Sequence, residues 1–227
     1  MFTFVRVYVY AFVAAALLGA AFSVSAANLV ANGSMTGTPI ISSPPPNWNS
    51  VSTDGDTIPV GGLSGWGTGI GASPDGGTFL AILNNGSGGS FDAATQTVSG
   101  FTVGAIYTLQ FSFSNIGLSS TAASNYANPG FVRANIAGLD FDTPVLTHDG
   151  FGSQRWFSFS SSFTATAPSM NLTFSAVREN SGFGGYAGGV DGVSISAVPE
   201  PETYAMLMAG LGLMGFVARC RAKKINA

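Results

Sequence analysis

Side chains that could perform acid–base or nucleophilic chemistry are few in this sequence. The single histidine, His148, precedes Asp149, and such a pair can serve as a general base beside a serine nucleophile. No Gly-x-Ser-x-Gly segment supplies that serine, so a surface turn is the simpler interpretation. The only cysteine is Cys220, which leaves too few soft ligands for a transition-metal site. We therefore expect no enzyme activity and no cofactor.

Carboxylates are the remaining candidates for catalysis. Two acids about 5–10 Å apart would suit glycoside hydrolysis, but spacing along the chain reveals no such pair. The segment from Gly67 to Ala72 imitates a dinucleotide-binding loop, yet Pro74 follows it and no helical pattern does. A hydrolase is therefore the third of three hypotheses for function.

The charge distribution excludes nucleic acid as a partner. Only 8% of the 227 residues are charged. Between Ala27 and Ala197 the chain has nine acids and no lysine, and its only cations are Arg133, Arg155 and Arg178. Phosphate binding requires clustered basic residues. The 18 phenylalanines supply enough apolar surface for a core.

The N-terminus has the layout of a secretory signal peptide. Arg6 is followed by an apolar stretch that reaches Phe22 and by small residues from Val24 to Ala27. We expect signal peptidase to cleave after Ala26 or Ala27. The alternative is an uncleaved membrane anchor.

An uncharged run of 15 residues, Tyr204 to Ala218, lies close to the C-terminus. As a helix it would cover roughly 22 Å, less than the ~30 Å hydrocarbon core, so a buried helix is an alternative to a single transmembrane helix. Pro201 precedes the run and a basic cluster follows it, which favours the membrane. The cluster consists of Arg219, Arg221, Lys223 and Lys224. The positive-inside bias then places this end in the cytoplasm and the preceding domain outside.

These C-terminal features resemble the PEP-CTERM sorting tail of Gram-negative bacteria, also called the ice-binding protein C-terminal domain. The resemblance rests on Pro199, Glu200 and Pro201, the short apolar helix and the basic tip, in that order. It implies that an exosortase removes the tail near the motif, and that the protein accompanies exopolysaccharide in a biofilm matrix. Cys220 departs from the pattern; it is either an acylation site or, more simply, a neutral replacement.

The segment between the two ends predicts an all-β fold. Apolar and polar residues alternate strictly in Tyr107–Asn115, and similar patterns follow in 155–167, 171–177 and 189–198. Glycine, proline and asparagine separate these segments. We expect an antiparallel β-sandwich of jelly-roll type.

Three short sequence segments of this region resemble carbohydrate-binding modules and galactose-binding-like jelly rolls. They are Asn28–Met35, Ser90–Asn115 and the closing Gly189–Val198. The resemblance implies a structural Ca²⁺ held partly by an acid in the first of these segments and by an aspartate in the last. Thr36 stands where that acid is usual, so Asp191 is only a weak candidate and we expect no metal. The pairs Asp54/Asp56 and Asp140/Asp142 could add oxygens, but such loop acids are usually solvated.

Four aromatic residues lie in segments that are predicted to be loops: Trp48, Trp66, Tyr126 and Tyr186. Aromatic faces stack on sugars, so these residues are candidates for carbohydrate contact; packing over the sandwich edge is the alternative. The glycine-rich segment Glu179–Gly192 is predicted to be a mobile loop.

The sequence thus predicts a signal peptide (1–26), an exported β-sandwich (27–197) and a sorting segment (198–224). The first hypothesis is a non-catalytic surface or matrix protein, exported through the inner membrane, anchored there transiently and released by exosortase. The second is a carbohydrate-binding protein that engages exopolysaccharide.

Overall fold

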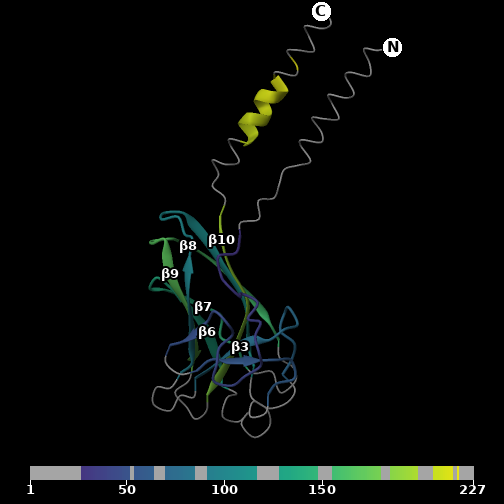
Figure 1. The fold of residues 1–227 in the computed structure, drawn as a ribbon, viewed down its shortest axis with the longest axis vertical. Coiled ribbons are helices and arrows are strands. Elements are labelled where there is room, and N and C mark those ends of the chain that lie inside the picture. Colours follow the sequence, from purple (N-terminus) through teal and green to yellow (C-terminus); the bar gives the residue numbers. More distant parts are fainter. Residues whose placement is uncertain are drawn as a thin grey trace, which may run out of the picture.

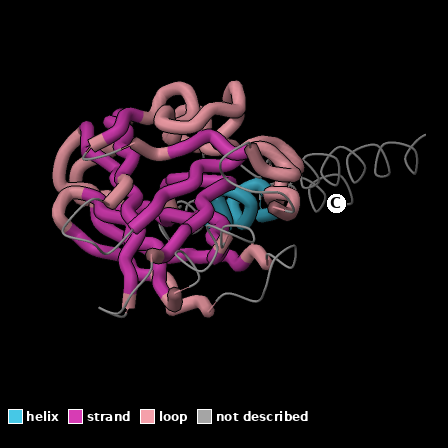
Figure 2. Tube along the Cα trace, turned by 90° about the horizontal axis from the view of Figure 1, so that it is seen from below, coloured by secondary structure: helices cyan, strands magenta, loops and turns pink. Residues whose placement is uncertain are grey.

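Two antiparallel sheets form the body of the protein. The computed structural model describes residues 27–51, 54–63, 70–84, 91–116, 128–147, 155–179, 185–198, 207–216 and 219. In spatial order, the first sheet holds β1 (Asn49–Ser50), β4 (Ala93–Ser99), β9 (Ser169–Arg178), β6 (Gly130–Ile136) and β7 (Leu139–Asp142). The second holds β2 (Asp56–Ile58), β3 (Phe79–Asn84), β10 (Tyr186–Ala197), β5 (Ile106–Asn115) and β8 (Phe157–Thr164). The strands from β3 to β6, and again from β8 to β10, alternate between the sheets, as in a jelly roll. Figures 1 and 2 show these strands gathered into one body.

The predicted alternation in β5 is confirmed. Tyr107, Leu109, Phe111 and Phe113 are all buried, while Thr108 and Gln110 lie toward solvent. Because successive strand side chains point to opposite faces, this pattern places four apolar residues in one core. Its partner across the core is β9, where Leu172, Phe174 and Ala176 are buried as predicted. The Phe111 and Phe174 rings from opposite sheets lie 4.9 Å apart.

The prediction of a loop over Glu179–Gly192 is wrong for its second half, because β10 begins at Tyr186. This strand lies between β3 and β5 and pairs with both. A Cβ on Gly188 would lie 3.0 Å from Val132, and one on Gly189 would lie 3.0 Å from the Trp156 ring. Glycine is therefore present because neighbouring side chains occupy the space, and not because the segment is flexible.

A β-bulge interrupts the pairing of β10 with β5 between Asp191 and Ser194. Gly192, inside the bulge, has a φ of 60°, a value that glycine adopts without strain. Bulges redirect side chains locally and are common beside functional sites. The bulge immediately follows Asp191, the buried acid of the closing segment Gly189–Val198.

Candidate functional site

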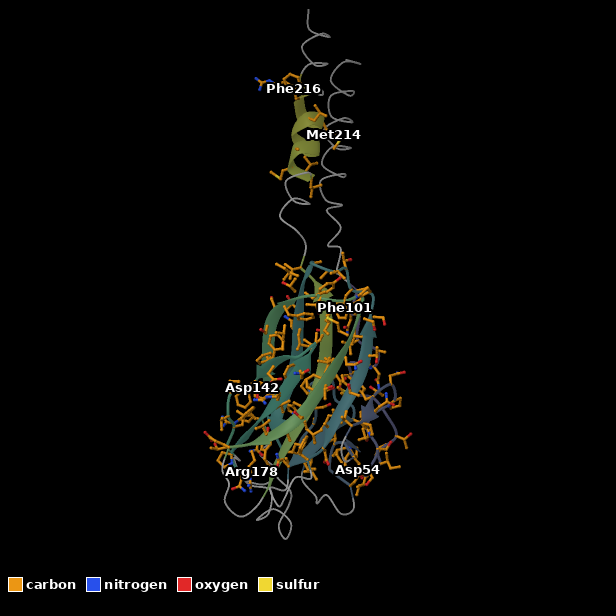
Figure 3. All side chains as sticks on the ribbon, turned by 90° about the vertical axis from the view of Figure 1, so that its left-hand side faces the viewer. Asp54, Phe101, Asp142, Arg178, Met214 and Phe216 are labelled. Atoms are coloured by element: carbon orange, nitrogen blue, oxygen red, sulfur yellow. The ribbon has the colours of Figure 1, made fainter. Side chains whose placement is uncertain are left out.

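The apolar helix predicted in the C-terminal tail is confirmed over residues 207–216. Large apolar side chains cover its surface: Leu207, Met208, Leu213, Met214 and Phe216 are all more than half exposed. Figure 3 shows Met214 and Phe216 well away from the sandwich, past the end that carries Phe101. Among the described residues, no helix is long and apolar enough to cross a membrane. A helix that none of the described residues covers nevertheless requires some other apolar environment.

The other predicted processing residues lie largely outside the described part of the chain. These residues are Ala26, Pro199, Glu200, Pro201, Arg221, Lys223 and Lys224. Ala27 and Arg219 are described, and both are exposed. The predicted roles of all these residues remain predictions.

Two of the four aromatic candidates are buried. Trp48 is 4% exposed and packs on Phe174 with ring centroids 5.6 Å apart, and its indole nitrogen donates to the Asn32 carbonyl at 3.3 Å. Tyr186 is fully buried in β10, not in a loop, and burial raises its pKa. Neither ring offers a face to a sugar, so packing describes their role. Trp66 and Tyr126 lie outside the described residues.

A small pocket lies where β5 ends and β8 begins. Its volume is about 100 Å³, and it is lined by Asn115, Val145, Leu146, Thr147, Arg155 and Phe157. The Arg155 guanidinium lies 5.7 Å from the centroid of the Phe157 ring, which is 38% exposed. Asn115 is 6% exposed; its amide nitrogen donates to two carbonyls, while its buried oxygen has no partner among the described residues. The pocket thus offers a partly exposed aromatic ring beside a cation.

Most of the loop acids are engaged in local structure. Arg133 pairs with Asp142 at 2.6 Å and with Asp140 at 3.3 Å, on the exposed edge strand β7. The buried Asp56 carboxylate accepts from the Ser42 amide, and a hydrogen bond from Ser42 lowers the pKa of Asp54. These pairs therefore behave as turn and edge residues, and they form no metal site among the described residues.

Asp191 differs from these acids because it is fully buried. Its Oδ1 accepts from the Gly192 amide at 2.8 Å, and its Oδ2 has no hydrogen-bond partner within geometric limits among the described residues. Burial raises the pKa of Asp191 to about 7; hydrogen bonding to Gly192 and to Ser73 opposes this shift, and Asp75 adds to it through its charge and a hydrogen bond. A buried carboxylate oxygen without a partner is costly, and it is the kind of ligand that Ca²⁺ prefers. Asp191 therefore stays a candidate calcium ligand, although no group of three or more acidic, histidine or cysteine side chains surrounds it among the described residues.

The sequence alone did not single out two residues that lie at these sites, Asp75 and Asn115. Asp75 lies in a Pro-Asp-Gly-Gly turn, whose composition indicates a solvated acid. Asn115 ends an alternating strand and has no distinguishing motif. Only the three-dimensional arrangement shows that one lies near enough to raise the pKa of Asp191 and that the other lines a pocket.

Comparison with known families matches residues 197–222 to the PEP-CTERM protein-sorting motif. The sorting tail predicted from the sequence is thereby confirmed. No match is found among the curated proteins.

Solved structures with a similar arrangement include several carbohydrate-binding modules. One is the CBM22-1 xylan-binding domain of Paenibacillus barcinonensis Xyn10C, with 10% identity over 77% of this chain and 97% of that one and a TM-score of 0.45. TmCBM61 in complex with β-1,4-galactotriose has 11% identity over 76% and 99% of the two chains and a TM-score of 0.42.

The enzymatically active domain of bacteriophage CBA120 tailspike protein 4 has 15% identity and a TM-score of 0.41. The match covers 75% of this chain and spans 21% of the length of the tailspike chain. Each of these is a resemblance and identifies no ligand for this protein.

Proposed function

We propose that this protein is an exported, non-catalytic surface or matrix protein that its C-terminal tail delivers to an exosortase. The observation that carries the proposal is the sorting motif at residues 197–222, together with the exposed apolar helix at 207–216 inside it. The helix supplies transient attachment to the inner membrane. The basic tip holds the C-terminus in the cytoplasm, and exosortase releases the β-sandwich outside. We associate the released domain with exopolysaccharide and biofilm.

The prolines of the motif explain how an enzyme gains access to it. Proline fixes φ and lacks an amide hydrogen, so Pro199 and Pro201 resist incorporation into a helix or a sheet. The sequence therefore predicts that the motif stays extended between the last strand, β10, and the apolar helix. A membrane-embedded processing enzyme meets an accessible backbone at the membrane surface.

Intact mass spectrometry of the full chain, expressed in cells with and without an exosortase, tests this proposal. We expect the product to begin at Ala27 or Asn28 and, only with exosortase, to lack the helix and basic tip. Replacing Pro199, Glu200 and Pro201 by alanine should reduce the processed fraction by at least about tenfold, because the recognised segment is lost. The matched control is the triple replacement of Ser158, Ser160 and Ser162 on β8 by alanine, which should be processed normally. Recovery of the protein from the cytosol with both Met1 and Ala227 present contradicts the proposal.

The pocket beside Phe157 favours a second candidate function, saccharide binding by the released domain. Its volume of about 100 Å³ suits one substituent of a sugar, such as a hydroxymethyl group, with the ring stacked on Phe157.

Retention of the mature protein on immobilised exopolysaccharide tests this second function. We expect Phe157→Ala to weaken retention about tenfold, because stacking on an aromatic ring contributes about 1 kcal/mol or more. The matched control is Phe91→Ala, which removes a ring that is 42% exposed and does not line the pocket. Equal retention of the two variants and the unaltered protein contradicts the assignment.

A further inference from the structure

In the described part of the chain, three of the strands at the sheet edges are protected against pairing with another chain. β1 has only 2 residues, and β7 carries Asp140 and Asp142 among its four. β2 has 3 residues, and its free side is covered because Ile40 and Thr57 exchange backbone hydrogen bonds of 3.0 Å. Short length, charge and a covering segment are the usual means by which an edge strand avoids a partner.

The remaining edge strand, β8, has none of these features. It is 8 residues long and contains no charged residue and no proline. Its pairing with β5 runs from Phe157 to Thr164 without a bulge. Only Phe163 is fully buried, so the rest of the strand is at least partly open to solvent. A long, uncharged and regular edge strand is the kind that accepts another strand.

The free backbone groups of β8 belong to alternate residues. The Ala165 amide donates to the Ala105 carbonyl at 3.0 Å, so Ala165 lies in the hydrogen-bonded phase of the pairing with β5. Hydrogen-bonded pairs recur at every second residue of an antiparallel pair. The amides and carbonyls of the intervening residues therefore point away from β5, and no other described backbone group bonds to them. These residues are Ser158, Ser160, Ser162 and Thr164.

We propose that the β8 strands of two copies of this chain pair antiparallel about a two-fold axis that passes by Ser161. Ser160 then faces Ser162 of the second copy, and Ser158 faces Thr164 of the second copy. Every outward amide and carbonyl of the strand gains a partner in this register. The two second sheets become one continuous sheet.

The side chains of β8 favour a second copy over another partner. Two identical strands repel where charged residues face each other, and β8 has no charge. Its outward side chains are hydroxyls, which hydrogen-bond across strands. The protein already joins strands in this way, since the Thr95 and Thr173 hydroxyls lie 2.9 Å apart between β4 and β9.

The association stops at two copies. A contact that uses the same strand on both copies closes on itself. Growth into a fibre would need a second open edge on the same sheet, and Ile40 covers that edge at β2. The proposal concerns the β-sandwich and goes beyond the sorting function of the tail.

Sedimentation equilibrium of the full chain in a density-matched detergent, at increasing protein concentration, tests this proposal. We expect the mass to reach that of two chains, with a Kd on the order of 10–100 μM, because a single strand pair is a small interface. Ser160→Pro should raise the Kd at least about tenfold, since proline lacks the outward amide and its ring blocks the approaching strand. Its Tm should stay close to that of the unaltered chain, because this amide does not bond to β5.

Paired charges distinguish a broken contact from a damaged fold. Replacing Ser160 and Ser162 both by glutamate, or both by lysine, should raise the Kd at least about tenfold, because like charges then face each other. An equimolar mixture of the two variants should recover the dimer to within about threefold, because opposite charges then meet. The matched control places the two glutamates at Ser169 and Asn171, which are exposed on the central strand β9, and should dimerise like the unaltered chain.

The mass of a single chain at every concentration overturns the proposal. A dimer that Ser160→Pro and both charged variants leave unchanged is held by another surface, such as the exposed helix at 207–216, and also overturns it. Failure of the mixture to recover the dimer means that the two serines do not face each other. That result overturns the pairing of β8 with β8. None of these outcomes bears on sorting, which is judged from the processed termini.

Discussion

Replacing Gly33 by alanine will destabilise the β-sandwich by about 3 kcal/mol or more, or prevent it from folding. A Cβ at this position would lie 1.9 Å from the Val193 carbonyl oxygen and 3.0 Å from its carbon. Both are backbone atoms, so no side-chain rotation relieves the clash. Separation of the two segments would also break the 2.7 Å hydrogen bond from the Val193 amide to the Gly33 carbonyl. Urea unfolding of the exported domain, followed by tryptophan fluorescence, measures the loss.

Gly104→Ala is the matched control for this close approach. Gly104 has a φ of 87°, and a Cβ there would have nothing within 4 Å. Its replacement should therefore cost only the strain of a left-handed backbone, about 1–2 kcal/mol. If Gly33→Ala costs no more than Gly104→Ala, the first and last segments do not approach as closely as the structure shows.

The strands that the sequence predicted best are those whose burial alternates. In β5 and β9 the inward side chains are large and apolar and the outward ones are mostly hydroxyl-bearing or amide residues, so a period of two is visible without any tertiary information. β8 shows the limit of this signal, since its predicted inward ring at Phe157 is 38% exposed while Phe163 is buried. Both residues lie on the same edge strand, so their place along it decides the difference: Phe163 packs against Phe101 and Tyr107, whereas Phe157 lines the pocket at the start of the strand.

The start of β10 was not predictable because its composition is that of a loop. Gly188 and Gly189 have too little side chain to produce an alternating pattern. Hydrogen bonds to β3 on one side and to β5 on the other hold these residues in a strand. Only glycine fits there because Tyr186, Val132 and Trp156 occupy the space that a larger side chain would need. Tertiary context overrides local propensity at such positions.

The candidate sites also differ in how far the sequence alone can predict them. The sorting tail is a continuous segment whose chemistry is local, so the sequence alone predicted it, and residues 197–222 match the motif. Asp191 was singled out from the sequence of the closing segment Gly189–Val198. Asp75 is 116 positions away from Asp191 in the sequence, and only the fold brings them together. Trp48, predicted to contact sugar, is buried because it immediately precedes β1 and packs on Phe174 in β9.

Phe174→Ala should cost about 3–5 kcal/mol, the usual loss for removing a buried phenylalanine. Phe174 is 0% exposed and its ring contacts Phe111 from the opposite sheet and Trp48 beside β1, at 4.9 and 5.6 Å between centroids. Removing the ring opens a cavity between the sheets. The chain between Ala27 and Ala197 has no cysteine, so no disulfide limits the effect. Urea unfolding measures the change in the free energy of unfolding.

Phe157→Ala is the control of equal size at the edge strand β8. The Phe157 ring is 38% exposed, so its replacement should cost about 1 kcal/mol. A loss at Phe174 as small as that at Phe157 would mean that the two sheets are not held together by the ring cluster. Stability would then have to come chiefly from the strand pairing within each sheet. A loss at Phe174 that is at least about 2 kcal/mol larger places the main stabilising contact between β5 and β9, which an exported domain without disulfides needs in order to survive outside the cell.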